Sequence, residues 1–191
     1  SGTFGTQEKF LHHALVEHAC DLYRCPRPPY GYGARAAADG ATAMTDVSDG
    51  LLLDLYHIAR HSQEKLGEEL RLQSEHIPAV GETVTLTFNL STEQVFAAAG
   101  ESLAELAALC AERVAQRDSG REIVRTWILS GGEDHGLVAT FPAGTELPGG
   151  FRQIGVVETV VATNDSSFIS IDGSEVSTVG GWESFNHVTQ Y

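Results

Sequence analysis

Ala43-Met44-Thr45-Asp46-Val47-Ser48-Asp49-Gly50-Leu51-Leu52-Leu53-Asp54-Leu55 is the stretch around which the rest of the chain is organised. An apolar run leads into it and a leucine-rich helical pattern follows, which predicts a strand, a tight turn and a helix. Hard cations such as Mg²⁺ prefer carboxylate oxygens and usually keep several waters. Asp46 and Asp49 are therefore candidate ligands for one or two such ions. Ser48 adds a neutral donor for a phosphate, and the amides that open the helix are candidate anion partners.

The same residues also have a purely structural interpretation. Asp and Ser in front of a helix are common N-cap residues, and Asp49-Gly50 is a common turn dipeptide. For Asp54 three interpretations stay open: it could face the same ion, bond to the backbone, or pair with Arg60 at the surface. A short motif is a hypothesis until its context supports it.

Bulk properties narrow the functional classes. The chain has 191 residues and a mean hydropathy of −0.10, which suits one domain with a substantial core. No apolar run reaches the roughly 20 residues that span a bilayer, and the start shows no signal-peptide pattern, so we expect no membrane partner. The net charge is −14, with only 12 Lys and Arg residues. This argues against nucleic-acid binding, and a phosphate ligand must be received by metal ions or backbone amides.

Cysteine usage points to a reducing compartment. Cys20, Cys25 and Cys110 form an odd, sparse set that does not indicate a disulfide framework. We therefore expect a cytoplasmic protein. Histidines cluster with two of these cysteines near the start of the chain, but their spacing matches no standard zinc pattern.

Periodicity and turn signals predict a mixture of helices and strands. The predicted helices cover 7–23, 30–38, 51–62 and 92–116, the last one capped by Ser91 and interrupted near Gly100. The predicted strands cover 41–46, 70–72, 84–88, 123–129, 136–141, 151–157, 168–171 and 175–178, the last two joined by the hairpin turn Asp172-Gly173. Several strands come in hairpin-like pairs, and this order favours an α+β fold or a layered α/β sandwich with a mixed, largely antiparallel sheet.

A second landmark is Ser130-Gly131-Gly132-Glu133-Asp134-His135-Gly136-Leu137. Two glycines in a row indicate a sharp turn or the close approach of a ligand. Glu133 and Asp134 follow directly at that point. A third is the tail Gly181-Trp182-Glu183-Ser184-Phe185, which sets aromatic residues beside glycines.

Taken in order, these three motifs resemble the C-terminal half of bacterial thiamine-monophosphate kinase. That family spells them as Met-Ile-Asp-Ile-Ser-Asp-Gly-Leu, Gly-Gly-Glu-Asp-Tyr-Glu-Leu and Gly-Trp/Tyr-Asp-His-Phe. The resemblance covers nearly the whole chain. Residues 1–6 are similar to the family's junction between domains, which leaves 7–191 as the C-terminal domain.

The resemblance implies a fold and partners. The superfamily includes aminoimidazole ribonucleotide synthetase, selenide water dikinase and a hydrogenase maturation protein. Each has an N-terminal ATP-binding domain that dimerises and a C-terminal α/β/α sandwich. The implied partners of this chain are its own N-terminal domain and, in the full-length protein, a second copy.

The resemblance also implies a reaction, the transfer of the ATP γ-phosphoryl group to thiamine monophosphate to give thiamine diphosphate. Asp46 and Asp49 would be catalytic Mg²⁺ ligands and Ser48 would touch the ATP phosphates. Glu133 would contact the thiamine phosphate and Trp182 would stack on its aromatic part. Phosphoryl transfer needs positioning and charge neutralisation more than covalent help, which suits these residue types.

One departure from the family keeps alternatives open. His135-Gly136 stands where the family has Tyr-Glu, so one carboxylate is missing. A superfamily relative with another acceptor, such as a ribonucleotide amide, stays possible, as does a non-catalytic domain for assembly or regulation. Because the N-terminal acids are absent, we expect this chain alone to show no kinase activity.

Overall fold

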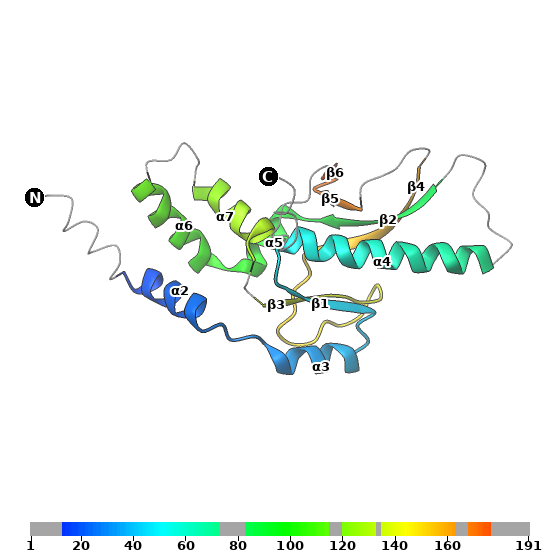
Figure 1. The fold of residues 1–191 in the computed structure, drawn as a ribbon, viewed down its shortest axis with the longest axis horizontal. Coiled ribbons are helices and arrows are strands. Elements are labelled where there is room, and N and C mark those ends of the chain that lie inside the picture. The colour runs from blue at the N-terminus through cyan, green and yellow to red at the C-terminus, as the bar shows by residue number, and fades with distance from the viewer. Residues whose placement is uncertain (1–12, 73–82, 115–119, 133–134, 163–167, 177–191) are drawn as a thin grey trace, which may run out of the picture.

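A computed structural model describes residues 13–72, 83–114, 120–132, 135–162 and 168–176. Its centre is the helix α4 (Leu51–Leu72), which lies between two sheets (Figure 1). On one side it contacts β1 (Ala43–Val47), which pairs with β3 (Gly136–Thr140). On the other side it contacts β2 (Thr83–Leu90) and β5 (Ile169–Ile171). The result is a layered arrangement in which one helix serves both sheets.

The two sheets differ in their pairing. β1 and β3 are antiparallel, with Ala43 opposite Thr140 and Val47 opposite Gly136. The larger sheet has the order β4-β2-β5-β6, where β4 is Gly155–Ala162 and β6 is Ser174–Glu175. Within it only β2 and β5 are parallel. The predicted α+β class with a mixed, largely antiparallel sheet is confirmed, with the strands divided between two sheets.

The remaining helices complete the layers (Figure 1). α3 (Tyr30–Ala38) contacts β3 on the outer side of the small sheet. α5 (Thr92–Ala99), α6 (Glu101–Val114) and α7 (Gly120–Ser130) form a group in which α7 contacts both its neighbours and α4. α2 (Ala14–Arg24) contacts α6. Among the helices in the described ranges, none alone is long and apolar enough to cross a membrane; α5 and Glu101–Glu112 meet the length and composition criterion only as a pair bent by 91°.

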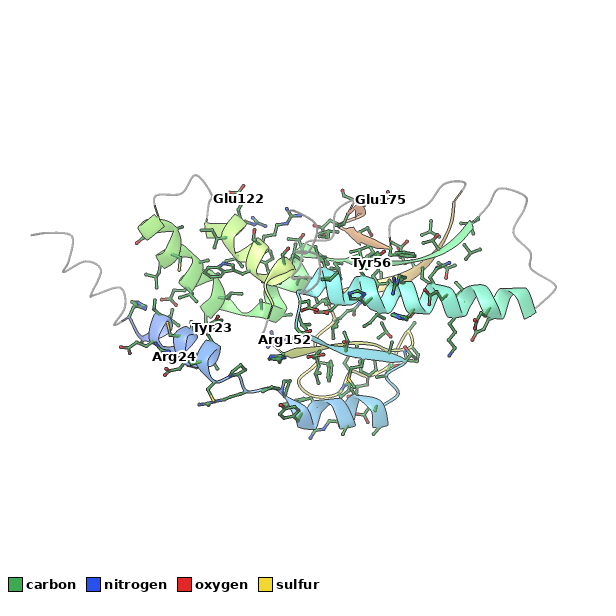
Figure 2. The ribbon with its side chains drawn as sticks, in the orientation of Figure 1. Tyr23, Arg24, Tyr56, Glu122, Arg152 and Glu175 are labelled. Carbon is green, nitrogen blue, oxygen red and sulfur yellow. The ribbon has the colours of Figure 1, made fainter. Side chains whose placement is uncertain are left out.

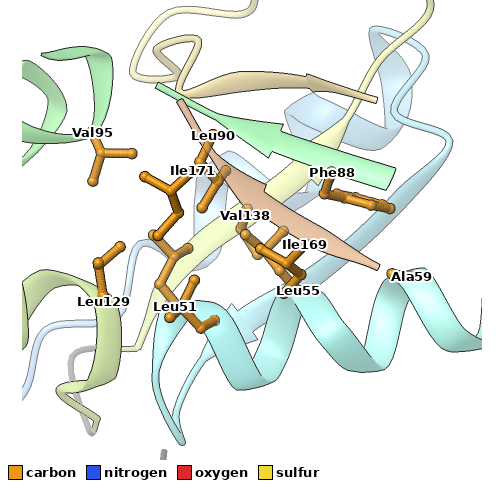
Figure 3. Packing of buried hydrophobic residues seen from close by; sticks show 11 residues of the cluster. Leu51, Leu55, Ala59, Phe88, Leu90, Val95, Leu129, Val138, Ile169 and Ile171 are labelled. Carbon is orange, nitrogen blue, oxygen red and sulfur yellow. The ribbon is translucent and has the colours of Figure 1, made fainter. Parts of the chain in front are cut away.

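The hydrophobic core forms where α4 meets the larger sheet (Figure 3). Leu51, Leu55 and Ala59 follow one stripe of the helix at a spacing of four residues and are all buried. Burying a Leu side chain of this kind stabilises the fold by about 1.5–3 kcal/mol. The core is completed from both sheets and the helical group by Phe88, Leu90, Val95, Leu129, Val138, Ile169 and Ile171. At the edge of the core, Tyr56 meets Phe168 edge to face, with ring centroids 5.7 Å apart (Tyr56 is labelled in Figure 2).

Several local predictions are confirmed in detail. The helix 30–38 has the expected bounds. Ser91 Oγ caps α5 by accepting from Gln94 N at 3.4 Å, and Gly100 separates α5 from α6 with a φ of 85°. Asp172 and Gly173 both have positive φ values, 50° and 76°, as the predicted hairpin turn requires.

Four other predictions are wrong. The predicted strand 123–129 lies in α7, because its apolar residues pack as one helical face against neighbouring helices, and such packing overrides weak strand propensity. The helix after the motif does not end near Ser62 but continues to Leu72, through the predicted strand 70–72. The predicted strand 151–157 is displaced to Gly155–Ala162. The predicted helix 7–23 is α2 from Ala14 on, and its first residues lie outside the described part.

The part of α4 beyond the predicted end near Ser62 is hydrogen-bonded to the larger sheet. Gln63 Nε2 donates to the carbonyl of Val84 at 2.6 Å, and Gln63 Oε1 accepts from Leu86 N at 2.8 Å. The amide side chain thus bonds to β2 as a neighbouring strand would, at residues that come before the point where β5 begins to pair with β2. This contact ties the second half of α4 to the larger sheet.

Candidate functional site

The first two sequence motifs meet at one end of the small sheet. Because β1 and β3 are antiparallel neighbours, the loop that leaves β1 and the loop that enters β3 lie side by side. His135 N donates to the carbonyl of Val47 at 3.0 Å and closes the pair. We call the segment 46–50 the acidic loop. We call the described residues Gly131, Gly132 and His135 the glycine loop. The candidate site is built where they touch.

Glycine is needed on both loops for this contact. A Cβ at Gly132 would lie 2.5 Å from the carbonyl oxygen of Ser48. Gly50 has a φ of 122°, and a Cβ there would lie 3.2 Å from the carbonyl of Ser130. Any side chain at Gly132 would push the loops apart. The glycine pair 131–132 was predicted to mark a sharp turn or the close approach of a ligand, and at Gly132 the structure shows the neighbouring backbone in that place.

Asp54 holds the backbone of the acidic loop in place through hydrogen bonds. Its Oδ2 accepts three backbone N–H groups, from Ser48 at 3.0 Å, Asp49 at 3.1 Å and Gly50 at 3.2 Å. The residue is 6% exposed. Of the three interpretations left open by the sequence, the structure shows the bond to the backbone. Because Asp54 occupies these three amides, an external anion could reach them only by displacing its carboxylate.

The predicted ligands occupy the outer side of this loop. Asp46 is the penultimate residue of β1 and its side chain is 52% exposed. Ser48 and Asp49 are half-buried in the turn. His135 Nδ1 lies 3.4 Å from Asp46 Oδ2. The sequence did not predict this contact, since the two residues are 89 positions apart and no local pattern links them.

Glu133, Asp134 and Trp182 lie outside the described residues. The structure therefore brings together Asp46, Ser48 and Asp49, and adds His135 to them. Within the described ranges, no group of three or more His, Cys, Asp or Glu residues could hold a metal ion. Two carboxylates do fit Mg²⁺, which binds through one or two carboxylates, substrate phosphates and waters and needs no all-protein cage.

A shallow cavity of about 800 Å³ lies elsewhere, between the α5–α6–α7 group and the β5–β6 turn. Phe96, Arg121 and Asp172 are among its lining residues, and none of them belongs to either loop. Arg121 lies over the Phe96 ring, 5.9 Å from its centroid. Hydrogen bonds from the Thr92 side chain and backbone hold the pKa of Asp172 below its ordinary value.

Comparisons with known proteins give the chain its context. No protein-family model matches it. It is 37% identical over 176 residues to the thiamine-monophosphate kinases of two strains of Mycobacterium tuberculosis, across 89% of this chain and 40% of each relative. It is 33% identical over 165 residues to that of Corynebacterium glutamicum, across 86% of this chain and 38% of the relative. The chain thus spans about two-fifths of the curated relatives it matches, and the resemblance read from its motifs is confirmed.

A solved structure, AaThiL complexed with AMPPCP and TMP, superposes with a TM-score of 0.60. The match covers 91% of this chain and 43% of that chain, at 20% sequence identity. At this identity the likeness establishes the fold.

Proposed function

We propose that this chain is the C-terminal domain of a thiamine-monophosphate kinase, which transfers the γ-phosphoryl group of ATP to thiamine monophosphate. The observation that carries the proposal is 37% identity across 89% of the chain to proteins of that name. The structural neighbour supports the substrate pair, since it is described with AMPPCP, an ATP analogue, and TMP. Residues 7–191 form the domain in this proposal, and 1–6 are the end of a junction.

The acidic loop is the proposed phosphate and metal site. Asp46 and Asp49 would hold Mg²⁺, and their exposed or half-buried carboxylates fit an ion that also contacts phosphates. When bound, Mg²⁺ screens the repulsion between the anionic donor and acceptor and stabilises charge on the transferring group. The Ser48 hydroxyl donates to an ATP phosphate oxygen. Asp54 keeps the turn in shape through its three backbone contacts.

Acceptor recognition is assigned to residues outside the described part. Glu133 contacts thiamine phosphate, and Trp182 stacks on its cationic thiazolium ring, a cation–π contact. Among the described residues, Gly132 and His135 are the nearest to Glu133 in sequence, and both lie against the acidic loop. No strong general base is required, since the second pKa of a phosphate monoester is about 6.

The rest of the enzyme is part of the same proposal. The relatives are longer than this chain, and we assign the additional length to an N-terminal ATP-binding domain through which the full-length protein dimerises. A cytoplasmic location follows from the cysteine usage, and Cys20, Cys25 and Cys110 are free thiols. Alone, this chain should not turn over ATP.

Product formation by the longer protein that carries this chain tests the proposal. It would be incubated with ATP and Mg²⁺ against thiamine, thiamine monophosphate and aminoimidazole-pathway ribonucleotides. Thiamine diphosphate from the monophosphate alone supports the proposal, and Asp46→Asn should then abolish turnover. Turnover of a ribonucleotide instead would favour the superfamily alternative, to which the His135-Gly136 departure points.

A further inference from the structure

His135 is held in an unusual backbone conformation beside the acidic loop. Its φ is 50°, and within the described ranges the only other non-glycine residue with positive φ is Asp172. It makes two contacts with consecutive residues of β1. Its N–H donates to the carbonyl of Val47 at 3.0 Å, and its ring Nδ1 lies 3.4 Å from Asp46 Oδ2.

The backbone contact alone does not explain a histidine at this position. A residue with a Cβ pays conformational free energy in the left-handed region, whereas Gly does not. Gly could donate the same N–H to Val47. What distinguishes His135 is the ring contact with Asp46, which neither the motif comparison nor the proposed reaction accounts for.

In the contact between His135 and Asp46, the ring is the donor and the carboxylate the acceptor. An ionised carboxylate only accepts hydrogen bonds, so the proton must be on Nδ1. With Oδ2 engaged by the ring, the second carboxylate oxygen of Asp46 is the one left for a cation. Hydrogen-bond partners behind ligating carboxylates orient them and tune metal affinity.

We propose that His135 is a positioning residue for the divalent cation, holding the Asp46 carboxylate through Oδ2 so that its other oxygen receives the ion. The inference rests on the proposed metal role of Asp46. The expected effect is moderate because the side chains of His135 and Asp46 are 37% and 52% exposed. Loss of the ring should weaken cation binding about three- to tenfold, at or below the lower limit of the roughly 10- to 100-fold that such partners contribute, because exposed charges interact weakly.

Mn²⁺ is the probe for the test, added to this chain while NMR follows the paramagnetic broadening of the Asp49 and Gly50 amide signals. His135→Gly keeps the backbone conformation and removes the ring. His135→Asn keeps left-handed tolerance and a donor that occupies a position similar to Nδ1. A matched control is His61→Ala, because the His61 ring is exposed on α4 and, among the described residues, bonds only to its own helix, at His57 O. Thermal melting by circular dichroism verifies that each variant is folded.

Support requires that His135→Gly raise the half-saturating Mn²⁺ concentration about three- to tenfold, with His135→Asn and the control within about twofold of wild type. In the longer protein, His135→Gly should raise the Mg²⁺ concentration for half-maximal rate and leave kcat at saturating Mg²⁺ nearly unchanged. Wild-type Mn²⁺ binding by His135→Gly, or His135→Asn as weak as His135→Gly, would overturn the inference.

Asp46→Asn separates this inference from the proposal beneath it. If Asp46→Asn leaves Mn²⁺ broadening unchanged, Asp46 is not a ligand and both fail. If Asp46→Asn weakens binding while His135→Gly does not, the metal role of Asp46 stands and only the positioning role of His135 is wrong.

Discussion

Replacing Asp54 by Asn should destabilise the chain by about 2 kcal/mol. The carboxylate is 6% exposed and one oxygen accepts three N–H groups at 3.0–3.2 Å. A hydrogen bond to a charged acceptor contributes about 1.5–3 kcal/mol and one to a neutral acceptor about 0.5–1.5 kcal/mol. Asn keeps an acceptor of the same shape and loses the charge. Since three donors share one oxygen, the three differences do not add fully. Asp54→Ala should cost more, about 3–5 kcal/mol, because no acceptor remains.

Urea denaturation of this chain measures the effect, read as a lower midpoint at unchanged slope. The corresponding fall in melting temperature is about 4–8 °C for a chain of this length. Asp21→Asn is the matched control, since the Asp21 side chain is 77% exposed and, within the described ranges, forms an ion pair only with Arg24, at 3.6 Å. Such pairs are worth about 0–1 kcal/mol. A free energy of unfolding for Asp54→Asn within about 0.5 kcal/mol of wild type would refute the reasoning.

Three further outcomes are expected. Gly132→Ala should destabilise the chain by about 1–3 kcal/mol, since its Cβ would meet the Ser48 carbonyl oxygen at 2.5 Å. Gly136→Ala, whose Cβ would meet no atom of the described residues within 4 Å, should change little in the same urea titration; equal effects would contradict the loop contact. Because its folded-state pKa is lowered, Asp172 contributes stability above the ordinary pKa of 3.8 and loses it as the pH falls through the lowered value. The stability difference between wild type and Asp172→Asn should therefore shrink on acidification, and a constant difference would count against it. Burial raises the pKa of Cys110, so in single-cysteine variants at about pH 8 a maleimide should label the exposed Cys25 faster; equal rates would contradict this.

The sequence was informative where structure is local. The strand, turn and helix of the acidic loop, the Ser91 cap and the Asp172-Gly173 hairpin each depend on residues within a few positions of one another. In these cases backbone preference and short-range hydrogen bonds decide the conformation. The prediction of an acidic turn between a strand and a helix followed from the same local rules.

Long-range contacts decided the rest. α7 is rich in β-branched and aromatic residues, and only its packing against α4, α5 and α6 makes it a helix. The part of α4 beyond Ser62 is bonded through Gln63 to β2, which lies more than 20 positions further along the chain. The spacing of Asp54 allowed an ion, the backbone or Arg60 as partner, and geometry alone selects among them. The contact between His135 and Asp46 has no local signature at all.

Because α4 lies between the two sheets, the position of the acidic loop depends on how the helix packs against the larger sheet. A two-stranded sheet such as β1–β3 has at best marginal stability by itself. The small sheet that carries the acidic loop is therefore stabilised by α4, and most of the buried residues of α4 pack in the core against the larger sheet. Phe88 and Ile169 belong to this core and to neither loop. Enlarging or truncating them should tilt or loosen the helix and with it the site at its first turn. Inherited or engineered changes in the larger sheet can therefore alter the candidate site from a distance, without contacting any of its residues.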